Sequence, residues 1–324
     1  MFFPHQKRAV VYIEAGLGNQ MFQYAYYKWL RGQGLNAWLD TDYFVPFPWQ
    51  KKIHERYKLA YFPLDDLRFV NLTADEYRQM LAVYEKFSEN WLALWRRTKK
   101  TYLGKILARR FLRKLFNRRL VPGARYYRET KNNREFFFTG VSPKQNVVLE
   151  GFFQSYKHLN EIRPGLLKAF SFNVSRLPKL VQAIGQDLRR GNSVVVHVRR
   201  NTYVALGLAL PLQYYVRAVA YLRERLPDLR FFVFSDDLDY VKTNFAFLGN
   251  YYAVDTAQIK RSDYYDLFLL SKAKHSIIAN STFSWWGAWL NQNPQKLVLV
   301  PDNWGFDIDI DTICPPEWIR ISAK

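Results

Sequence analysis

The chain has 324 residues, of which 49% are hydrophobic and 18% aromatic, so it can bury more than one core and is not a disordered chain. One cysteine, Cys314, excludes an intramolecular disulfide, and no apolar run approaches the ~20 residues that span a bilayer. We therefore expect a cytoplasmic protein in which Cys314 is a small buried hydrophobic residue. The formal charge of +20 leaves nucleic acid, an anionic membrane and an anionic ligand open as partners.

Strand and helix patterns alternate along the chain. Short β-branched or aromatic runs predict strands at Ala9–Glu14, Ala37–Leu39, Val147–Glu150, Ser193–Val198, Leu229–Ser235, Tyr251–Val254, Ser276–Ala279 and Lys296–Val300. Helical patterns follow in the second half at Leu212–Arg225, Leu238–Phe247, Ser262–Ser271 and Trp285–Asn291. The alternation favours an α/β protein with mainly parallel sheets covered on both faces. Proline and glycine between the two sets of elements predict domains 1–165 and 166–324.

The residues directly after the predicted strands are the most polar, glycine-rich or hydroxyl-rich of the chain. Ligands of open α/β sheets bind beyond the carboxyl ends of the strands. The segments at these positions are Ala15–Gln20, Asp40–Asp42, Gly151–Ser155, His197–Tyr203, Asp236-Asp237 and Asn280–Ser284. This coincidence is the first indication of a ligand site.

Gly16 and Gly18 follow the first predicted strand and open a helix. Glycine permits positive φ and close approach of the backbone to a ligand, and a helix N-terminus favours phosphate. Asn19 and Gln20 add amide donors and acceptors. An ordinary tight turn with an Asn–Gln cap explains the same pattern. The third glycine of the dinucleotide fingerprint is missing, which disfavours NAD.

A buried apolar strand delivers His197, Arg199 and Arg200 to its carboxyl end, and alternation puts His197 and Arg199 on one face. The guanidinium fork matches phosphate oxygens bidentately. A diphosphate leaving group needs either a divalent metal or fixed arginines to compensate its charge. We interpret the arginines as a diphosphate site; salt bridges to neighbouring carboxylates are the alternative.

Two further strand ends carry chemistry that suits a nucleotide. A carboxylate at Asp236 or Asp237 can accept two hydrogen bonds from guanine, although the same residues make a good helix N-cap. Hydroxyls at a helix N-terminus suit a diphosphate, and they also form a capping cluster. The segment with this pattern consists of Ser281, Thr282, Phe283 and Ser284.

Five ordered blocks of sequence resemble the bacterial α-1,2-fucosyltransferases (glycosyltransferase family 11). The first and last blocks are long and specific, and the five span residue 10 to about 305. They are Gly16-Leu17-Gly18-Asn19-Gln20-Met21-Phe22-Gln23-Tyr24-Ala25, Gly151-Phe152-Phe153-Gln154, His197-Val198-Arg199-Arg200, Phe232-Val233-Phe234-Ser235-Asp236-Asp237-Leu238 and Ile277-Ile278-Ala279-Asn280-Ser281-Thr282-Phe283-Ser284-Trp285-Trp286.

The resemblance implies a GT-B-like fold, with two Rossmann-type domains whose mainly parallel sheets face a central cleft. It implies that residues 1–165 bind the acceptor and that residues 166–324 bind GDP-L-fucose. The implied reaction is transfer of L-fucose, with inversion and without a metal, to the 2-hydroxyl of a galactoside in a cell-surface glycan.

The family's site residues carry over onto matching positions of this chain. The resemblance implies that Arg199 stabilises the departing GDP and that His197 and Asn19 lie near the reacting centre. The implied donor contacts are Gly16, Gly18, Gln20, Arg200, Asp236, Asp237, Ser281, Thr282, Phe283 and Ser284, with Asp237 as the guanine reader. We expect the acceptor to contact Asp40, Asp42 and Gln154. The general base stays open between Glu150 and Asp42.

We expect no metal. Asp40 and Asp42 form an Asp-x-Asp pair of the kind that binds metal in many glycosyltransferases, but the pattern recurs at Asp237/Asp239, Asp307/Asp309 and Asp309/Asp311. No His, Cys and carboxylate set has the spacing of metal ligands.

Two positions depart from the family pattern. Thr202 stands where the family has an aspartate, and threonine can hydrogen-bond but carries no charge. Ala15 stands where the family has glycine. These departures keep two alternatives open: a transferase for another GDP-hexose, and a catalytically inactive sugar-binding relative.

Much of the excess positive charge lies in a basic segment, about residues 90–128, with 13 Lys and Arg and no Asp or Glu. A helical wheel places Ala108, Phe111, Leu112, Leu115 and Phe116 opposite Arg109, Arg110, Arg113, Lys114 and Arg118. Such a helix can lie on anionic lipid, which would suit a lipid-linked acceptor at the inner membrane. The alternative is a surface helix packed on the N-terminal domain. Because the charge is local and no nucleic-acid motif is present, we expect no nucleic-acid partner.

Overall fold

A computed structural model describes residues 7–44, 56–70, 121, 123–142, 144–256, 259 and 262–324. The chain forms two compact units. The first contains Met1–Ala15, Phe22–Tyr57 and Asp65–Phe153, and the second contains Gly16–Met21, Lys58–Leu64 and Gln154–Lys324. The last segment of the second unit begins at Gln154, at the edge of the division that the sequence predicts near residue 165, give or take a dozen. The sequence pattern did not predict that two short early segments belong to the second unit.

The first unit is built on a four-stranded parallel sheet in the order β2-β1-β4-β3. The strands are β1 (Arg8–Tyr12), β2 (Asn36–Asp40), β3 (Arg125–Arg128) and β4 (Val147–Glu150). The unit also contains most of α1 (Leu17–Gly32), together with α5 (Arg134–Thr139) and the short 3-10 helix η1 (Asp42–Phe44). The Tyr26 hydroxyl of α1 donates to the carbonyl oxygen of Phe137 in α5 at 2.5 Å, which ties the two helices together.

The second unit is built on a six-stranded parallel sheet in the order β10-β9-β8-β5-β6-β7. The strands are β5 (Asn192–Val198), β6 (Leu229–Ser235), β7 (Tyr251–Val254), β8 (His275–Ile277), β9 (Val298–Pro301) and β10 (Ile319–Ile321). Two parallel sheets confirm the predicted α/β class with two Rossmann-type sheets. The predicted strands are all present, whereas β3 and β10 were missed.

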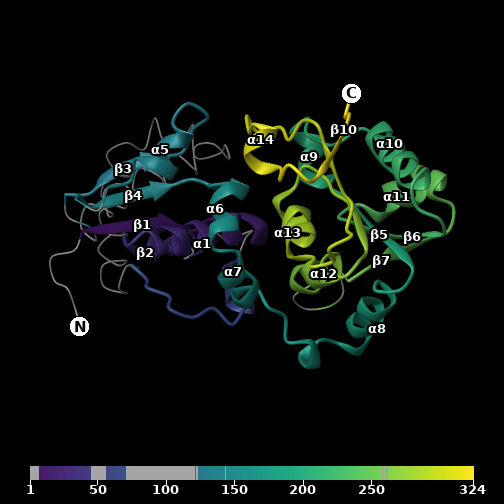
Figure 1. The fold of residues 1–324 in the computed structure, drawn as a ribbon, viewed down its shortest axis with the longest axis horizontal. Coiled ribbons are helices and arrows are strands. Elements are labelled where there is room, and N and C mark those ends of the chain that lie inside the picture. The colour runs from purple at the N-terminus through teal and green to yellow at the C-terminus, as the bar shows by residue number, and fades with distance from the viewer. Residues whose placement is uncertain are drawn as a thin grey trace, which may run out of the picture. The chain divides into compact units, whose positions relative to one another are not determined.

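Helices cover both faces of the six-stranded sheet. The helices of the second unit are α6 (Tyr156–Glu161), α7 (Arg163–Ala169), α8 (Lys179–Asp187), α9 (Asn201–Ala205), α10 (Leu212–Arg223), α11 (Leu238–Asn244), α12 (Ser262–Leu270), α13 (Thr282–Leu290) and α14 (Ile310–Ile313), with 3-10 turns η2 (Leu59–Tyr61), η3 (Val174–Arg176) and η4 (Ala246–Leu248). In Figure 1, α10 and α11 lie on one side of β5 and β6, and α12 and α13 lie on the other.

The alternation of side chains along the buried strand β5 decides which face of the sheet its polar residues occupy. Val194, Val196 and Val198 join the core cluster formed with Tyr214, Val219 and Leu222 of α10. Successive side chains of a strand point to opposite faces. His197, and Arg199 directly after the strand, therefore face the side of the sheet that carries α13.

Three predictions concern the remainder of the chain. Most of the basic segment lies outside the described residues, but Arg125–Arg128 at its end form strand β3, where we had predicted part of a helical insertion. Among the described residues no helix is long and apolar enough to cross a membrane. Cys314 is buried, as predicted, and burial raises the pKa of its thiol to about 11.

Candidate active site

His197 lies at the end of β5 against the first turn of α13. Its ring centroid is 5.9 Å from that of Phe283. The side chain is buried, and Nδ1 has no hydrogen-bond partner among the described residues. Burial, helped by the charge of Arg199, lowers the pKa of His197 to about 3. The imidazole is therefore neutral near pH 7, and it is suited to hydrogen bonding rather than to charge compensation.

The two arginines after β5 are ion-paired with the two aspartates after β6. The Arg199 Nη1 atom lies 3.0 Å from Asp236 Oδ2, and the backbone N–H of Arg200 donates to Asp236 Oδ1 at 2.8 Å. Arg200 Nε lies 3.4 Å from Asp237 Oδ2, and its guanidinium stacks 3.4 Å from the ring centroid of Tyr240. Asp237 also accepts from the Tyr240 N–H as the N-cap of α11.

These contacts show which predicted groups are still available to a ligand. The salt-bridge alternative for the arginines and the N-cap alternative for Asp237 are both present in the structure. The Arg199 side chain nevertheless remains 37% exposed. Arg199 can therefore contact a phosphate while it remains paired with Asp236, and Asp236 acts as its support.

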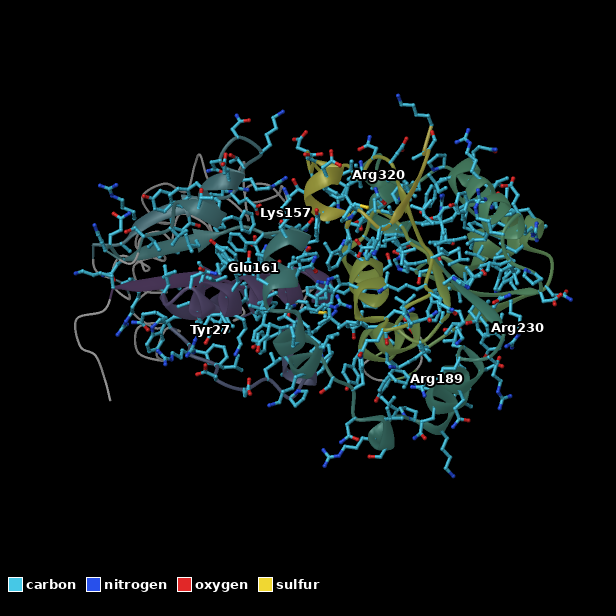
Figure 2. The ribbon with its side chains drawn as sticks, in the orientation of Figure 1. Tyr27, Lys157, Glu161, Arg189, Arg230 and Arg320 are labelled. Atoms are coloured by element: carbon cyan, nitrogen blue, oxygen red, sulfur yellow. The ribbon has the colours of Figure 1, made fainter. Side chains whose placement is uncertain are left out.

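A different ion pair occupies the opposite end of β6. Arg230, labelled in Figure 2, lies near the start of this strand, and its Nη2 donates to both carboxylate oxygens of Asp187 at 2.8 and 2.7 Å. The two pairs thus use the same chemistry at the two ends of one strand. Since ligands bind at carboxyl ends, only the pair of Arg199 and Asp236 is placed for a ligand.

The first turn of α13 can offer its backbone N–H groups to a ligand because its N-cap side chain does not use them. The N-cap residue Ser281 makes no side-chain capping bond with the described residues. The Ser284 hydroxyl donates to the Ser281 carbonyl oxygen at 3.3 Å. The N–H groups of the first turn have no acceptor within the helix and carry its positive dipole end. This turn can hold an anionic oxygen, as the sequence predicts.

Gly18 packs directly on this turn. A Cβ atom at Gly18 would lie 2.7 Å from the backbone nitrogen of Phe283 and 2.7 Å from Thr282 Oγ1. The Trp286 indole N–H donates to the Gly18 carbonyl oxygen at 3.0 Å, which anchors the segment. Neither Gly16 nor Gly18 uses the positive φ that glycine permits; the left-handed residue of this turn is Ala15, with φ of 65°. Gly18 is required here for close packing on α13.

Asn19 accepts hydrogen bonds from two segments that are distant in sequence. Its Oδ1 atom accepts from Gln154 Nε2 at 3.0 Å and from Thr282 Oγ1 at 3.1 Å. Gln154, which we predicted to bind the acceptor, has a buried Oε1 with no partner among the described residues. Gln20 accepts the Lys58 N–H at 2.8 Å, so its side chain fixes the start of the segment Lys58–Leu64.

Of the predicted acceptor and base residues, Asp40, Asp42 and Glu150 lie in the first unit, whereas Gln154 begins the last segment of the second unit. Asp40 ends β2 and Glu150 ends β4, and the intervening strand β1 places Tyr12 opposite Asp40. Asp40 is buried and accepts the Asp42 N–H at 2.9 Å, which closes the turn after β2. Glu150 is buried, with Arg128 Nε at 3.7 Å. Binding of an acceptor here stays a prediction, and so does the choice of base.

Sequence reasoning missed Glu129. Its Oε2 atom accepts the N–H groups of Phe152 and Phe153, both at 2.8 Å, and Arg134 pairs with Oε1 at 3.0 Å. Phe153 has φ of 50° and stacks on Tyr26 with ring centroids 4.0 Å apart. Glu129 thus fixes a strained turn directly before Gln154. No local motif marks this role, because Phe152 and Phe153 are more than twenty positions away from Glu129.

The described residues contain no group of three or more His, Cys, Asp or Glu that could hold a metal ion. The charge-compensating groups beside the β5 end are side chains of arginine. That the reaction needs no metal stays a prediction from the sequence.

Comparison with known proteins gives concordant matches. The sequence model described as glycosyl transferase family 11 matches residues 88–322. WbnK, an O-antigen biosynthesis glycosyltransferase of Escherichia coli, is 28% identical over 95% of this chain and 99% of its own length. An alpha-1,2-colitosyltransferase of Escherichia coli is 34% identical over 56% of this chain and 64% of its own length.

Solved structures show a distant likeness. The fucosyltransferase NodZ from Bradyrhizobium is 14% identical, with 88% of this chain and 93% of that chain covered and a TM-score of 0.49. At this TM-score the likeness carries no argument about the donor or the acceptor.

Proposed function

The chain belongs to glycosyl transferase family 11 and is a glycosyltransferase, and we propose that it transfers L-fucose from GDP-fucose to the 2-hydroxyl of a galactoside. The transfer inverts the anomeric carbon and requires no metal. The acceptor is a glycan. The name of the relative that takes part in O-antigen biosynthesis supports a cell-surface glycan.

One observation carries the proposal: three groups suited to a sugar diphosphate converge at the carboxyl edge of the second sheet. Arg199 follows β5 on the face that carries α13, and His197 contacts Phe283 in the first turn of that helix. The hydroxyl of Thr282 in the same turn donates to Asn19 at 3.1 Å. A guanidinium, a helix N-terminus and an amide therefore lie at the carboxyl edge of one sheet.

These groups account for departure of the nucleotide. The β-phosphate gains negative charge as its bond to the sugar breaks. A fixed guanidinium and the backbone N–H groups of α13 stabilise that charge more in the transition state than in the ground state. Asp236 holds Arg199 in place beforehand, so little reorganisation is needed. Neutral His197 can hydrogen-bond to the donor without adding charge.

A second donor is favoured by one comparison. The relative with 34% identity is named for transfer of colitose, which is L-fucose without its 3-hydroxyl. Thr202 also departs from the pattern of the fucosyltransferases. The alternative proposal is therefore transfer of another 6-deoxyhexose from its GDP derivative on the same scaffold.

The decisive experiment incubates the protein with a β-galactoside and either GDP-fucose, GDP-colitose or GDP-mannose, and reads the product linkage by NMR. We expect an α-1,2-linked fucoside, formed at the same rate with EDTA as with added Mn²⁺. A product only with GDP-colitose would support the alternative, and loss of turnover in EDTA would contradict the metal-free reaction.

Replacement of Arg199 tests the charge-compensating group. Arg199→Ala should lower kcat by a hundredfold or more, since a donor aimed at developing charge contributes roughly 3–4 kcal/mol. Arg230→Ala, at the other end of β6, is the matched control and should change kcat less than threefold. A loss below threefold in Arg199→Ala would refute the assigned role.

A further inference from the structure

The loop after β9 contains a solvent-exposed aromatic residue whose backbone is strained. Gly305, Phe306 and Asp307 are consecutive residues with φ of 75°, 55° and 55°. Left-handed backbone is unfavourable for residues other than glycine, and such strain clusters at ligand sites. The Phe306 side chain is 47% exposed, although nothing in local propensity favours a bulky residue in this conformation.

Phe306 is connected to the arginine site through one side chain. Its ring meets the ring of Tyr203 edge-on, with centroids 5.5 Å apart. The guanidinium of Arg199 lies 5.5 Å from the centroid of that same Tyr203 ring. The Tyr203 hydroxyl donates to the carbonyl oxygen of Asn280 at 3.3 Å. The exposed ring therefore lies one side chain away from the group that we assign to the diphosphate.

Asn280 lies beside the same loop and has an unsatisfied acceptor. The side chain is buried, and its Nδ2 donates to the Leu208 carbonyl oxygen at 3.0 Å, which fixes the orientation of the amide. The opposite atom, Oδ1, is buried and has no hydrogen-bond partner among the described residues. A Cβ atom at Gly305 would lie 3.8 Å from Nδ2. An unpaired buried acceptor is costly, and a ligand hydroxyl would satisfy it.

The strand order places Phe306, which follows β9, beyond the diphosphate, with Asn280 between β8 and α13. Asp236 and Asp237 follow β6, Arg199 follows β5, and α13 begins after β8; β9 is the next strand in the sheet. A nucleotide whose base lies at β6 and whose diphosphate lies at β5 and β8 extends its sugar towards β9, because neighbouring strands are about 4.8 Å apart.

We propose that Phe306 and Asn280 form the subsite for the donor sugar, and that this subsite selects a 6-deoxyhexose; the inference rests on the proposed function. The ring of Phe306 packs on the apolar edge of the sugar that carries the C6 methyl group. A sugar hydroxyl donates to Asn280 Oδ1. Because Oδ1 is buried, this contact requires a local shift around Asn280, and the left-handed residues 305–307 lie beside its amide.

The test compares three ligands that differ stepwise: GDP, GDP-β-L-fucose and GDP-β-L-galactose, which adds a hydroxyl at C6. Affinities are measured by calorimetry for the wild type, Phe306→Ala and Asn280→Ala. Tyr252→Ala is the matched control, because Tyr252 is an exposed aromatic residue at the far edge strand β7. Binding of GDP with unchanged affinity shows that a variant is folded.

We expect the wild type to prefer GDP-fucose over GDP-L-galactose at least tenfold, within the range that an apolar contact can discriminate. Phe306→Ala should narrow that preference below threefold, with GDP affinity within twofold of the wild type. Asn280→Ala should weaken both GDP-sugars at least fivefold and GDP hardly at all. Tyr252→Ala should match the wild type for all three ligands.

Other outcomes overturn the inference and separate it from the proposed function. Equal weakening of GDP and GDP-fucose in Phe306→Ala, or no weakening of either, would remove Phe306 from the sugar subsite. Because Phe306 is exposed, its variant carries the test even where Asn280→Ala does not fold. A wild-type protein that binds neither GDP nor GDP-fucose would instead overturn the proposed function itself.

Discussion

At the scale of single residues, the carboxylate of Asp236 fixes two consecutive arginines. It pairs with the Arg199 guanidinium at 3.0 Å and accepts the Arg200 N–H at 2.8 Å. The family pattern has an aspartate where this chain has Thr202, which is exposed on α9. Asp236 therefore supplies a negative partner that Thr202 cannot supply, and it holds Arg199 in one orientation before the donor arrives.

We expect Asp236→Asn to lower kcat/KM about tenfold, which corresponds to about 1.4 kcal/mol of transition-state stabilisation. The amide keeps the size and an acceptor, but it no longer attracts the guanidinium, so Arg199 becomes less well positioned. Steady-state kinetics with GDP-fucose measures the effect. Asp187→Asn breaks the ion pair with Arg230 and should leave kcat/KM within twofold. A similar loss in both variants would indicate a general effect on stability.

Ala15 bears backbone strain that glycine would relieve. Its φ of 65° lies in the left-handed region, at the position where the family has glycine. Ala15→Gly should raise the free energy of unfolding by about 0.5–1 kcal/mol. This net gain is the strain energy that glycine releases in the folded state, reduced by the greater conformational entropy that glycine gives to the unfolded chain. Urea denaturation measures the change. Ala205→Gly, at an exposed helical position with ordinary φ, should lower stability by up to about 1 kcal/mol. A gain of stability in both variants would contradict the explanation.

At the scale of elements, the first turn of α13 packs so closely on Gly18 that it leaves no room for a larger residue. Since a Cβ atom at Gly18 would lie 2.7 Å from backbone and side-chain atoms of that turn, Gly18→Ala must push the two apart. We expect a loss of about 1–3 kcal/mol in stability and at least tenfold weaker GDP binding, measured by thermal denaturation and calorimetry. Gly165→Ala is the control: Gly165 lies in α7 with no atom within 4 Å of the added Cβ, and this variant should be stabilised. Unchanged GDP affinity in Gly18→Ala would show that the packing does not shape the site.

Elements with a strong local pattern were predictable, and elements that depend on partners were not. Strand β6 has the predicted bounds because an aromatic and β-branched run over residues 231–234 ends at Ser235. Strand β3 is short, has arginine at both ends and lies at a sheet edge, so no apolar run marks it. The ends of β5 and β8 also placed Arg199 and Ser281 correctly at one edge of the sheet. The pairing of Arg199 with Asp236 and the contact of Gly18 with Phe283 depend on residues far apart in sequence, which no local pattern reports.

At the scale of the whole molecule, the second unit depends on two early segments of the chain. Gly18 accepts the indole N–H of Trp286, and Asn19 accepts the hydroxyl of Thr282. Phe62, from the segment Lys58–Leu64, packs with ring centroids 5.1 Å from Phe170 and 5.4 Å from Tyr264. Removal of these segments would leave polar groups of α13 unpaired and aromatic surface exposed.

A fragment of residues 154–324 should therefore be less stable than its intact sheet suggests. We expect a thermal midpoint well below that of the full chain, binding of a dye specific for exposed apolar surface, and at least tenfold weaker GDP binding. Co-expression with residues 7–70, which contain both segments, should restore co-purification and GDP binding because the lost contacts can form between two chains. If the fragment alone matches the full chain in thermal midpoint and GDP affinity, then the early segments are dispensable, and Asn19 and Gly18 do not belong to the donor site.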